Sequence, residues 1–175
     1  MGMNVAASEA PRAGLRSTYQ VEVNLRPELF DAKGQAALAL LHGAGLATAR
    51  EVRAGEIYEI RGTLNAGQLQ QTARDLLCDA VTQQYRILDL AGAPGSNGMN
   101  HWRVEVWLKE SMDDPVARTL SEAFLDLGLP APESLRRGLA YHVSGRCHRI
   151  QIEKAVALTL ADPAIHRFIV SEARP

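Results

Sequence analysis

The sequence repeats its own pattern at a fixed offset of 83 positions. When residues 18–87 are laid over residues 101–170 without a gap, 14 of the 70 positions are identical, whereas about four identities are expected by chance at residue frequencies of about 6%. This self-similarity predicts a duplicated structural unit. The identical pairs include Val21/Val104, Glu22/Glu105, Val23/Val106, Asp31/Asp114, Gly45/Gly128, Tyr58/Tyr141 and Asp79/Asp162.

The duplication divides the chain into four predicted parts. We expect a disordered leader at residues 1–17, a first unit at 18–89, a linker at 90–100 and a second unit at 101–172. The leader has no apolar run of the length that a signal peptide needs. The linker, LAGAPGSNGMN, is rich in glycine and offers few side chains for a core. Because it can span a small domain when extended, the two units can lie side by side.

Each unit begins with the pattern of a strand and a helix. YQVEVNL (19–25) and WRVEVWL (102–108) alternate apolar and polar residues, which predicts a half-buried strand. Asp31 and Asp114 can cap the helix that follows, and Gly45 and Gly128 can end it in a left-handed conformation. The apolar face of this helix in the second unit is predicted to comprise Val116, Leu120, Ala123, Phe124 and Leu127.

The most similar short stretches, EVRAGEIYEIRG (51–62) and SLRRGLAYHVSG (134–145), come next. We interpret each as two short strands that meet at a glycine turn, at Gly55 and Gly138. A second helix and a closing strand, QYRIL or RFIVS, complete the unit. The order β-α-β-β-α-β predicts an α+β chain of two tandem ferredoxin-like units, each an antiparallel sheet covered by two helices. In the first unit the apolar face of the second helix is predicted to hold Leu69, Ala73, Leu76, Leu77 and Ala80.

Charge and composition argue against several classes of protein. The formal net charge of -1 and the pI near 6.5 give no basic face for nucleic acid or an anionic membrane. No segment approaches 18 uninterrupted apolar residues, so we expect a soluble cytoplasmic protein. Cys78 and Cys147 lack the spacing of a disulfide framework or a zinc site, and we expect both to be reduced packing residues.

The sequence contains no recognisable catalytic or cofactor motif. The glycine-rich AGAPGSNG lacks the spacing and the Lys-Ser/Thr pair of a phosphate loop. Residues 146–149 (RCHR) are predicted to form a solvated turn rather than a ligand site. Asp113 and Asp114 are predicted to belong to a helix cap rather than a carboxylate pair. We therefore predict no catalytic, cofactor-binding or metal-binding residues.

Trp107 is the exception to the repeat. It lies on the opposite side of its strand from Val104 and Val106, and its equivalent in the first unit is the polar Asn24. We predict that it covers the seam between the units, with an external partner surface as the alternative. The candidate seam or partner contacts are Arg53, Gly55, Tyr58, Arg136, Gly138, Tyr141 and Trp107.

The order of these motifs resembles the PurS family, the small subunit of phosphoribosylformylglycinamidine synthase. YQVEVNLRPELFDAKGQA looks like the family's opening strand and helix entry, EVRAGEIYEI like its Val-Arg-x-Gly-Lys-x-Tyr stretch, and LLCDAVTQQYRI like its closing segment. Glu56 and Leu139 replace the family's lysine. The first unit has Ala32 and Ala80 where the family often has proline, whereas the second unit keeps these prolines, as Pro115 and Pro163.

The resemblance implies a non-catalytic subunit of a purine-biosynthesis ligase. Such a subunit docks a glutaminase on a large synthetase, which binds ATP and magnesium and amidates formylglycinamide ribonucleotide. It also implies that the two units form an internal pseudodimer, in place of the dimer of single-copy relatives.

Two alternatives use the same order of strands and helices. A tandem ACT-type module would bind an amino acid between paired domains, but such modules have a glycine after the first strand, where this chain has RPELFD and KESMDD. Paired RNA-recognition domains would need aromatic residues on a basic sheet, which VEVNL and the near-neutral charge do not offer.

Overall fold

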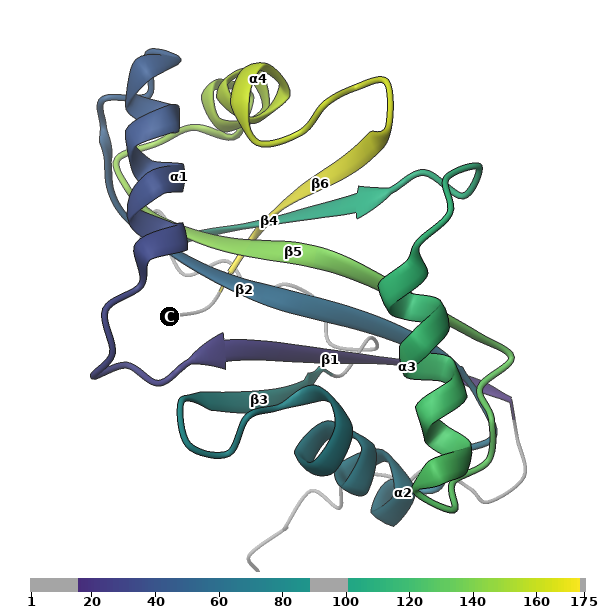
Figure 1. The fold of residues 1–175 in the computed structure, drawn as a ribbon. Coiled ribbons are helices and arrows are strands. Elements are labelled where there is room, and N and C mark those ends of the chain that lie inside the picture. Colours follow the sequence, from purple (N-terminus) through teal and green to yellow (C-terminus); the bar gives the residue numbers. More distant parts are fainter. Residues whose placement is uncertain (1–15, 89–100, 174–175) are drawn as a thin grey trace, which may run out of the picture.

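The strands form one continuous sheet. The computed structural model describes residues 16–88 and 101–173, which fold into a six-stranded antiparallel sheet in the order β3-β1-β2-β5-β4-β6. The helices lie on one face of this sheet (Figure 1), which confirms the predicted α+β class. The elements are β1 (Ser17–Leu25), α1 (Ala32–Gly43), β2 (Ala49–Gly62), α2 (Ala66–Gln71), the π-helical η1 (Thr72–Leu77), β3 (Gln83–Leu88), β4 (His101–Leu108), α3 (Pro115–Asp126), β5 (Ser134–Gly145), α4 (Arg149–Thr159) and β6 (His166–Glu172).

The predicted glycine turns at Gly55 and Gly138 were wrong. β2 runs without a break through Gly55, and β5 does the same through Gly138. Among the described residues, positive φ angles occur only at Gly45, Gly128 and Gly145, so neither Gly55 nor Gly138 has the left-handed conformation of a tight hairpin turn. The two short strands expected in each unit are therefore one long strand.

These two long strands pair with each other at the centre of the sheet. The antiparallel β2–β5 register places Glu56 opposite Leu139, and these two residues occupy the same place in the repeat, 83 positions apart. The register of β1 with β2 and β3 also recurs in β4 with β5 and β6 at this offset. A pseudo-twofold axis therefore passes between Glu56 and Leu139.

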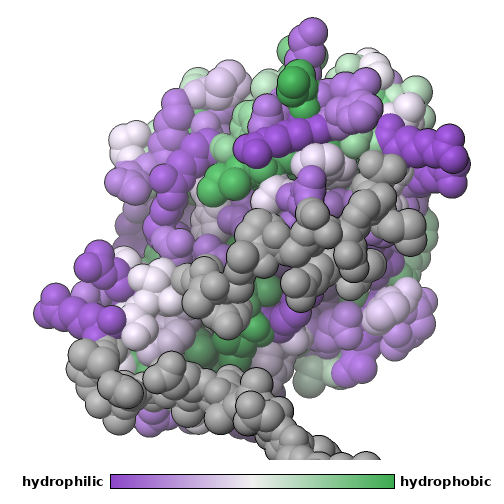
Figure 2. All heavy atoms as spheres, turned by 180° about the vertical axis from the view of Figure 1, so that it is seen from behind, coloured by the Kyte–Doolittle hydropathy of each residue, from purple (hydrophilic) through white to green (hydrophobic). Residues whose placement is uncertain are grey.

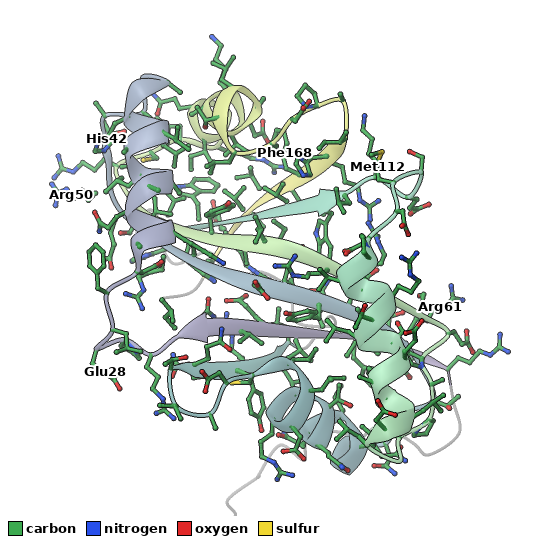
Figure 3. All side chains as sticks on the ribbon, viewed as in Figure 1. Glu28, His42, Arg50, Arg61, Met112 and Phe168 are labelled. Carbon is green, nitrogen blue, oxygen red and sulfur yellow. The ribbon has the colours of Figure 1, made fainter. Side chains whose placement is uncertain are left out.

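The helices of the two units are exchanged across this axis. α1 packs beside α4 and α3 beside η1, as Figure 1 shows. One core joins Leu41 of α1 to Val104 and Ile152 of the second unit. The other joins Phe124 of α3 to Val21 of the first. Each core therefore contains parts of both units, and Figure 3 shows the side chains that fill the space between sheet and helices.

The helix ends follow the predicted caps. Asp31 accepts a hydrogen bond from the Gly34 N–H, and Asp114 accepts from the Val116 and Ala117 N–H groups, so both satisfy free donors of a first turn. Gly45 and Gly128 follow the helices with φ angles of 90° and 67°, as predicted.

Two predicted core positions were wrong, for different reasons: the buried face of α3 is turned relative to the predicted one, and the second helix of the first unit ends before Ala80. Val116 is 46% exposed and Ala117 is buried in its place. Ala80 lies beyond the end of η1 and is exposed.

The predicted leader lies largely, and the predicted linker entirely, outside the described residues. Residues 1–15 of the predicted leader and residues 90–100 of the predicted linker lie outside the described residues, and β1 already begins at Ser17. Within residues 16–88 and 101–173, none of the helices combines the length and the apolar content that a membrane crossing needs.

Candidate functional site

The sheet face without helices carries most of the predicted contact residues. Because side chains alternate along a strand, Arg53 and Gly55 of β2 and Arg136 and Gly138 of β5 share this face with Trp107 of β4. Figure 2 views the molecule from this side and shows hydrophilic residues around smaller hydrophobic patches. Tyr58 and Tyr141 lie on the opposite face, inside the two cores. The structure therefore divides the candidate residues between two faces.

The two glycines make room for a neighbouring side chain. A Cβ atom on Gly138 would lie 2.8 Å from Cε3 of Trp107 and 2.8 Å from the Val106 carbonyl oxygen. A Cβ atom on Gly55 would lie 2.0 Å from Oδ1 of Asn24 and 2.7 Å from the Val23 carbonyl oxygen. Asn24 and Trp107 are equivalent positions, so each glycine lets the side chain from the adjacent strand lie flat against the sheet.

Trp107 is buried at the seam between the units. It is 2% exposed and packs with Ile57 and Ala140. Its Nε1 donates to Glu105 Oε2 at 2.9 Å, and the guanidinium of Arg136 lies 5.4 Å from the ring centroid, within the range of a cation–π interaction.

The repeated arginines donate hydrogen bonds to the end of the first strand of each unit. Arg53 Nη2 donates to the Leu25 carbonyl oxygen at 3.4 Å, and Arg136 Nη2 donates to the Leu108 carbonyl oxygen at 3.2 Å. Leu25 and Leu108 are equivalent residues. The arginine that recurs in the repeat therefore has a structural use in both units.

The repeated tyrosines have unlike surroundings. Tyr58 donates a short hydrogen bond to Glu56, and Arg137 Nη2 donates to Glu56 Oε1 at 2.7 Å. Burial raises the pKa of Glu56, but the bonds from Arg137 and Tyr58 outweigh it and lower the pKa overall. Burial and the Glu56 carboxylate both raise the pKa of Tyr58, whereas burial alone raises that of Tyr141.

A buried carboxylate connects the two units on the helix-free face. Glu22 of β1 is fully buried. Its Oε1 accepts from His142 Nε2 of β5 and, at 2.8 Å, from Asn24 Nδ2. Arg86 Nη2 lies 3.7 Å from the same oxygen. Arg103 Nη2 of β4 lies 3.0 Å from Oε2, as an ion pair whose angles do not meet hydrogen-bond geometry.

These partners keep Glu22 ionised. Burial alone raises the pKa of a carboxyl group. Here the hydrogen bond and charge of His142, the hydrogen bond from Asn24 and the charge of Arg103 outweigh burial, and the pKa falls from 4.5 to about 2. Glu22 is therefore a fixed negative charge at the floor of this face.

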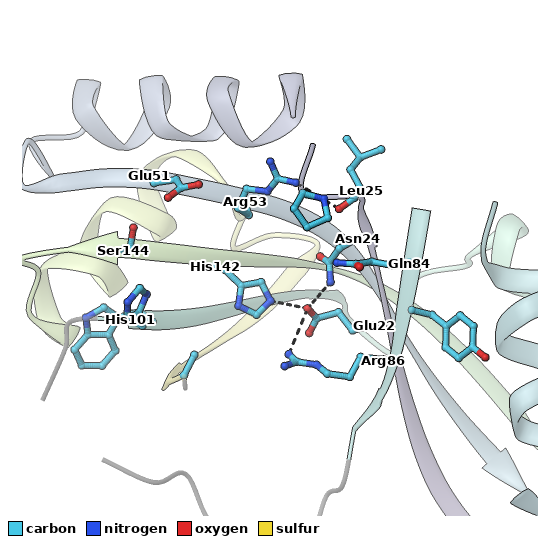
Figure 4. A pocket seen from close by; sticks show the side chains of 14 residues that line it. Glu22, Asn24, Leu25, Glu51, Arg53, Gln84, Arg86, His101, His142 and Ser144 are labelled. Carbon is cyan, nitrogen blue, oxygen red and sulfur yellow. Dashed lines mark hydrogen bonds and ion pairs between the residues drawn. The ribbon is translucent and has the colours of Figure 1, made fainter. Parts of the chain in front are cut away.

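A cleft with a volume of about 730 Å³ opens beside Glu22. Figure 4 shows its lining side chains, with the contacts of His142, Asn24 and Arg86 converging on Glu22. Five strands contribute residues, and the polar or charged ones among them are Glu22, Asn24, Glu51, Arg53, Gln84, Arg86, His101, His142 and Ser144. This cleft is larger than a single side chain would need and lies within the size range of small-molecule sites.

Sequence reasoning missed the Glu22 cluster. Two signals could have found it: Glu22 and Glu105 are identical across the repeat, and each is an acid between two valines of a strand. The structure brings Arg103 to both, since its Nη1 lies 3.2 Å from Glu105 Oε1. His142 had no such signal, because its equivalent is Glu59.

The other predicted features lie away from this cluster. Cys147 is buried and Cys78 is half-buried, both as free thiols. Arg146, His148 and Arg149 are exposed at the start of α4. No group of three His, Cys, Asp or Glu side chains is placed to hold a metal ion in the part of the chain that the structure describes.

Part of the chain matches the model of a known protein family. Residues 18–89 match the PurS family, described as phosphoribosylformylglycinamidine (FGAM) synthase. The matched range covers β1 to β3. No curated protein matches the chain.

Proposed function

We propose that this chain is a non-catalytic subunit of phosphoribosylformylglycinamidine synthase in purine biosynthesis. The observation that carries the proposal is the PurS match over residues 18–89. In this role the chain docks the glutaminase on the synthetase, so that ammonia from glutamine reaches formylglycinamide ribonucleotide. ATP and magnesium are bound by the synthetase.

Residues 101–172 pair with residues 18–89 and complete their cores, as a second copy of a single-unit chain would in a dimer. β2 pairs with β5 along 12 registered positions, and each core takes one helix from the other half. We propose that residues 18–89 and 101–172 form an internal pseudodimer, in which covalent linkage replaces association between separate subunits. Light scattering after size-exclusion chromatography should then give the mass of a single chain, and a stable homodimer joined through β2 would contradict the proposal.

The direct test is reconstitution with the two partner subunits. Purified synthetase and glutaminase from the same organism are mixed with and without this chain, and amidine formation is measured with glutamine as the nitrogen donor. Glutamine-dependent activity should rise with the chain and saturate at a fixed stoichiometry.

The matched control replaces glutamine with ammonium chloride. Free ammonia bypasses the glutaminase, so the activity of the synthetase should change much less when the chain is added. Equal glutamine-dependent rates with and without the chain, together with no co-elution of the three proteins, would discard the function.

A further inference from the structure

A second hollow, which we call the α1 groove, opens beside α1 on the face of the sheet that carries the helices. It has a volume of about 530 Å³, which lies within the size range of small-molecule sites. Figure 1 shows β2 and β5 crossing the sheet between α1 and α3. The apolar side chains that line the groove include Ala36, Leu40, Val106, Leu108, Leu139 and Leu160.

Tyr141 brings a hydroxyl without a partner to this groove. The hydroxyl forms no hydrogen bond with any described residue, and burial alone raises its pKa, so it keeps its proton at neutral pH and remains a donor. Among the described side chains, the unpaired polar atoms that are sealed from solvent belong to other residues. The Tyr141 hydroxyl is therefore accessible from outside the protein.

The equivalent tyrosine of the first unit shows which partner such a hydroxyl takes. Tyr58 donates to the carboxylate of Glu56, which precedes it by two residues on β2, and Arg137 donates to the same carboxylate at 2.7 Å. On β5 the residue two positions before Tyr141 is Leu139, whose side chain has no acceptor. The second unit thus keeps the tyrosine donor and lacks the carboxylate.

Two further side chains bring hydrogen-bond donors to the groove. Lys33 of α1 is 73% exposed, and its Nζ lies 3.9 Å from the carboxylate of Glu56, which is too far for a hydrogen bond. His166 of β6 accepts from the Asp162 N–H through Nδ1. The neutral His166 ring therefore carries its proton on Nε2, where it can donate to a ligand.

The acids near the groove are already engaged. Glu56 accepts from Tyr58 and Arg137 and does not line the groove. Asp114 does line it, but its Oδ1 accepts from two N–H groups at the start of α3. Donors without a partner therefore outnumber free acceptors, which favours a ligand with an anionic acceptor.

The strand register places these donors at one end of an apolar floor. Tyr141 lies beside Ala54 in the sheet, and Leu139 lies beside Val106 one step further along. Leu108 follows at the end of β4. The floor therefore leads from the Tyr141 hydroxyl over apolar side chains, as expected for a ligand with its anionic group at one end.

We propose that the α1 groove binds a small apolar carboxylate. The carboxylate accepts a hydrogen bond from the Tyr141 hydroxyl and lies near the ammonium group of Lys33, in the relation that Glu56 has to Tyr58 in the first unit. The apolar body covers Leu139 and Val106. This inference goes beyond the proposed function, because it concerns a site of this chain alone and is tested without partner subunits.

Three probes separate the parts of the proposal, with binding measured by isothermal titration calorimetry. Octanoate has the apolar chain and the carboxylate, octan-1-ol keeps the chain without the charge, and acetate keeps the charge without the chain. We expect octanoate to bind at one site, octan-1-ol to bind about fivefold or more weakly, and acetate not to bind. No binding of octanoate at millimolar concentration, or equal affinities for octanoate and octan-1-ol, overturns the proposal.

Tyr141→Phe removes the donor and keeps the ring. Because the hydroxyl has no partner among the described residues, the melting temperature should not change, whereas the affinity for octanoate should fall about fivefold or more. The control, Tyr85→Phe, also loses a hydroxyl, but Tyr85 lines the cleft on the opposite face of the sheet and binding should be unaffected. Unchanged octanoate affinity in Tyr141→Phe, or an equal loss in both variants, refutes the assignment.

A second pair of variants blocks the groove without touching its donors. Ala36 is an exposed residue of α1 that lines the groove, so Ala36→Phe should place a ring in it and abolish octanoate binding. Gln35→Phe adds the same ring at the neighbouring exposed position, which does not line the groove, and should bind octanoate as the parent does. Parent-like binding by Ala36→Phe would show that octanoate binds elsewhere, and equal losses in both variants would also contradict the proposal.

Discussion

The helix-free face has two equivalent regions, one around Asn24 in the first unit and one around Trp107 in the second, which share the same strand pairing but differ in how their side chains pack. Their strands share one register at an offset of 83 positions, yet one end packs Trp107 against Ile57 and Ala140 and the other leaves a polar cleft around Asn24. In a homodimer every substitution appears at both ends. Joining the halves in one chain removes this restriction, so one end can be specialised for packing while the other stays open.

The largest expected difference between the two regions comes from truncating their equivalent side chains, Trp107 and Asn24. Trp107→Ala removes a fully buried aromatic ring, and we expect it to lower the free energy of unfolding by about 3–5 kcal/mol. Asn24→Ala removes one hydrogen bond to Glu22 and should cost about 1 kcal/mol. Denaturant unfolding measures both values, and equal costs would mean that the two ends do not differ in packing.

Acid titration tests the Glu22 cluster. The folded pKa of about 2 lies below the ordinary value of 4.5. Ionised Glu22 therefore stabilises the fold above about pH 4.5, and this contribution, about 3 kcal/mol, is lost as the pH falls towards 2.

Glu22→Gln should consequently flatten the loss of stability between pH 4.5 and pH 2. Glu105→Gln is the matched control at the equivalent position and should keep most of the acid sensitivity of the parent chain. The same acid profile in the parent and in Glu22→Gln would show that the carboxylate is not the group responsible.

A methyl group at each glycine sharpens the comparison further. Gly138→Ala forces a Cβ atom against the buried ring of Trp107, so we expect a loss of about 2–3 kcal/mol. At Gly55 the nearest atom is Oδ1 of Asn24, which can rotate into the cleft, although the Val23 carbonyl oxygen stays close. Gly55→Ala should cost about 1 kcal/mol. Thermal unfolding of both variants ranks them, and the reverse order would contradict this account.

The smallest expected difference is between the two tyrosines. Tyr58→Phe removes the hydrogen bond to Glu56 and should cost about 1 kcal/mol. The Tyr141 hydroxyl donates to no other group among the described residues, so Tyr141→Phe should leave stability within about 0.5 kcal/mol of the parent. Chemical denaturation distinguishes them if the measurements are precise to a few tenths, and a larger loss for Tyr141→Phe would count against the assignment.

Local patterns predicted local structure well. The alternation of YQVEVNL and WRVEVWL predicted two strands, and the two aspartates and two glycines predicted the ends of α1 and α3. These predictions succeed because a strand period and a helix cap depend on a few neighbouring residues.

The role of the repeated glycines could not be predicted from the residues next to them in the sequence. Gly55 suggested a turn because glycine is common in turns, but its role is to leave room, through its missing Cβ, for the side chain of Asn24 on the adjacent strand. The same limit applies to Glu22, whose partners His142 and Arg103 come from the other half of the chain. Contacts made across strands and across the pseudo-twofold axis leave no periodic signal in either stretch of sequence.

Glu56 and Leu139, the residues at the pseudo-twofold axis, also affect which halves of the chain can pair through their long strands. If the first half paired with its own copy through β2, Glu56 would face a second Glu56, and Arg137, which neutralises it in the native pair, would be replaced by its equivalent Ala54. Like charges directly opposite each other destabilise an antiparallel pair. The Glu56–Leu139 pairing thus disfavours pairing of the first half with a second copy of itself, relative to pairing with the second half.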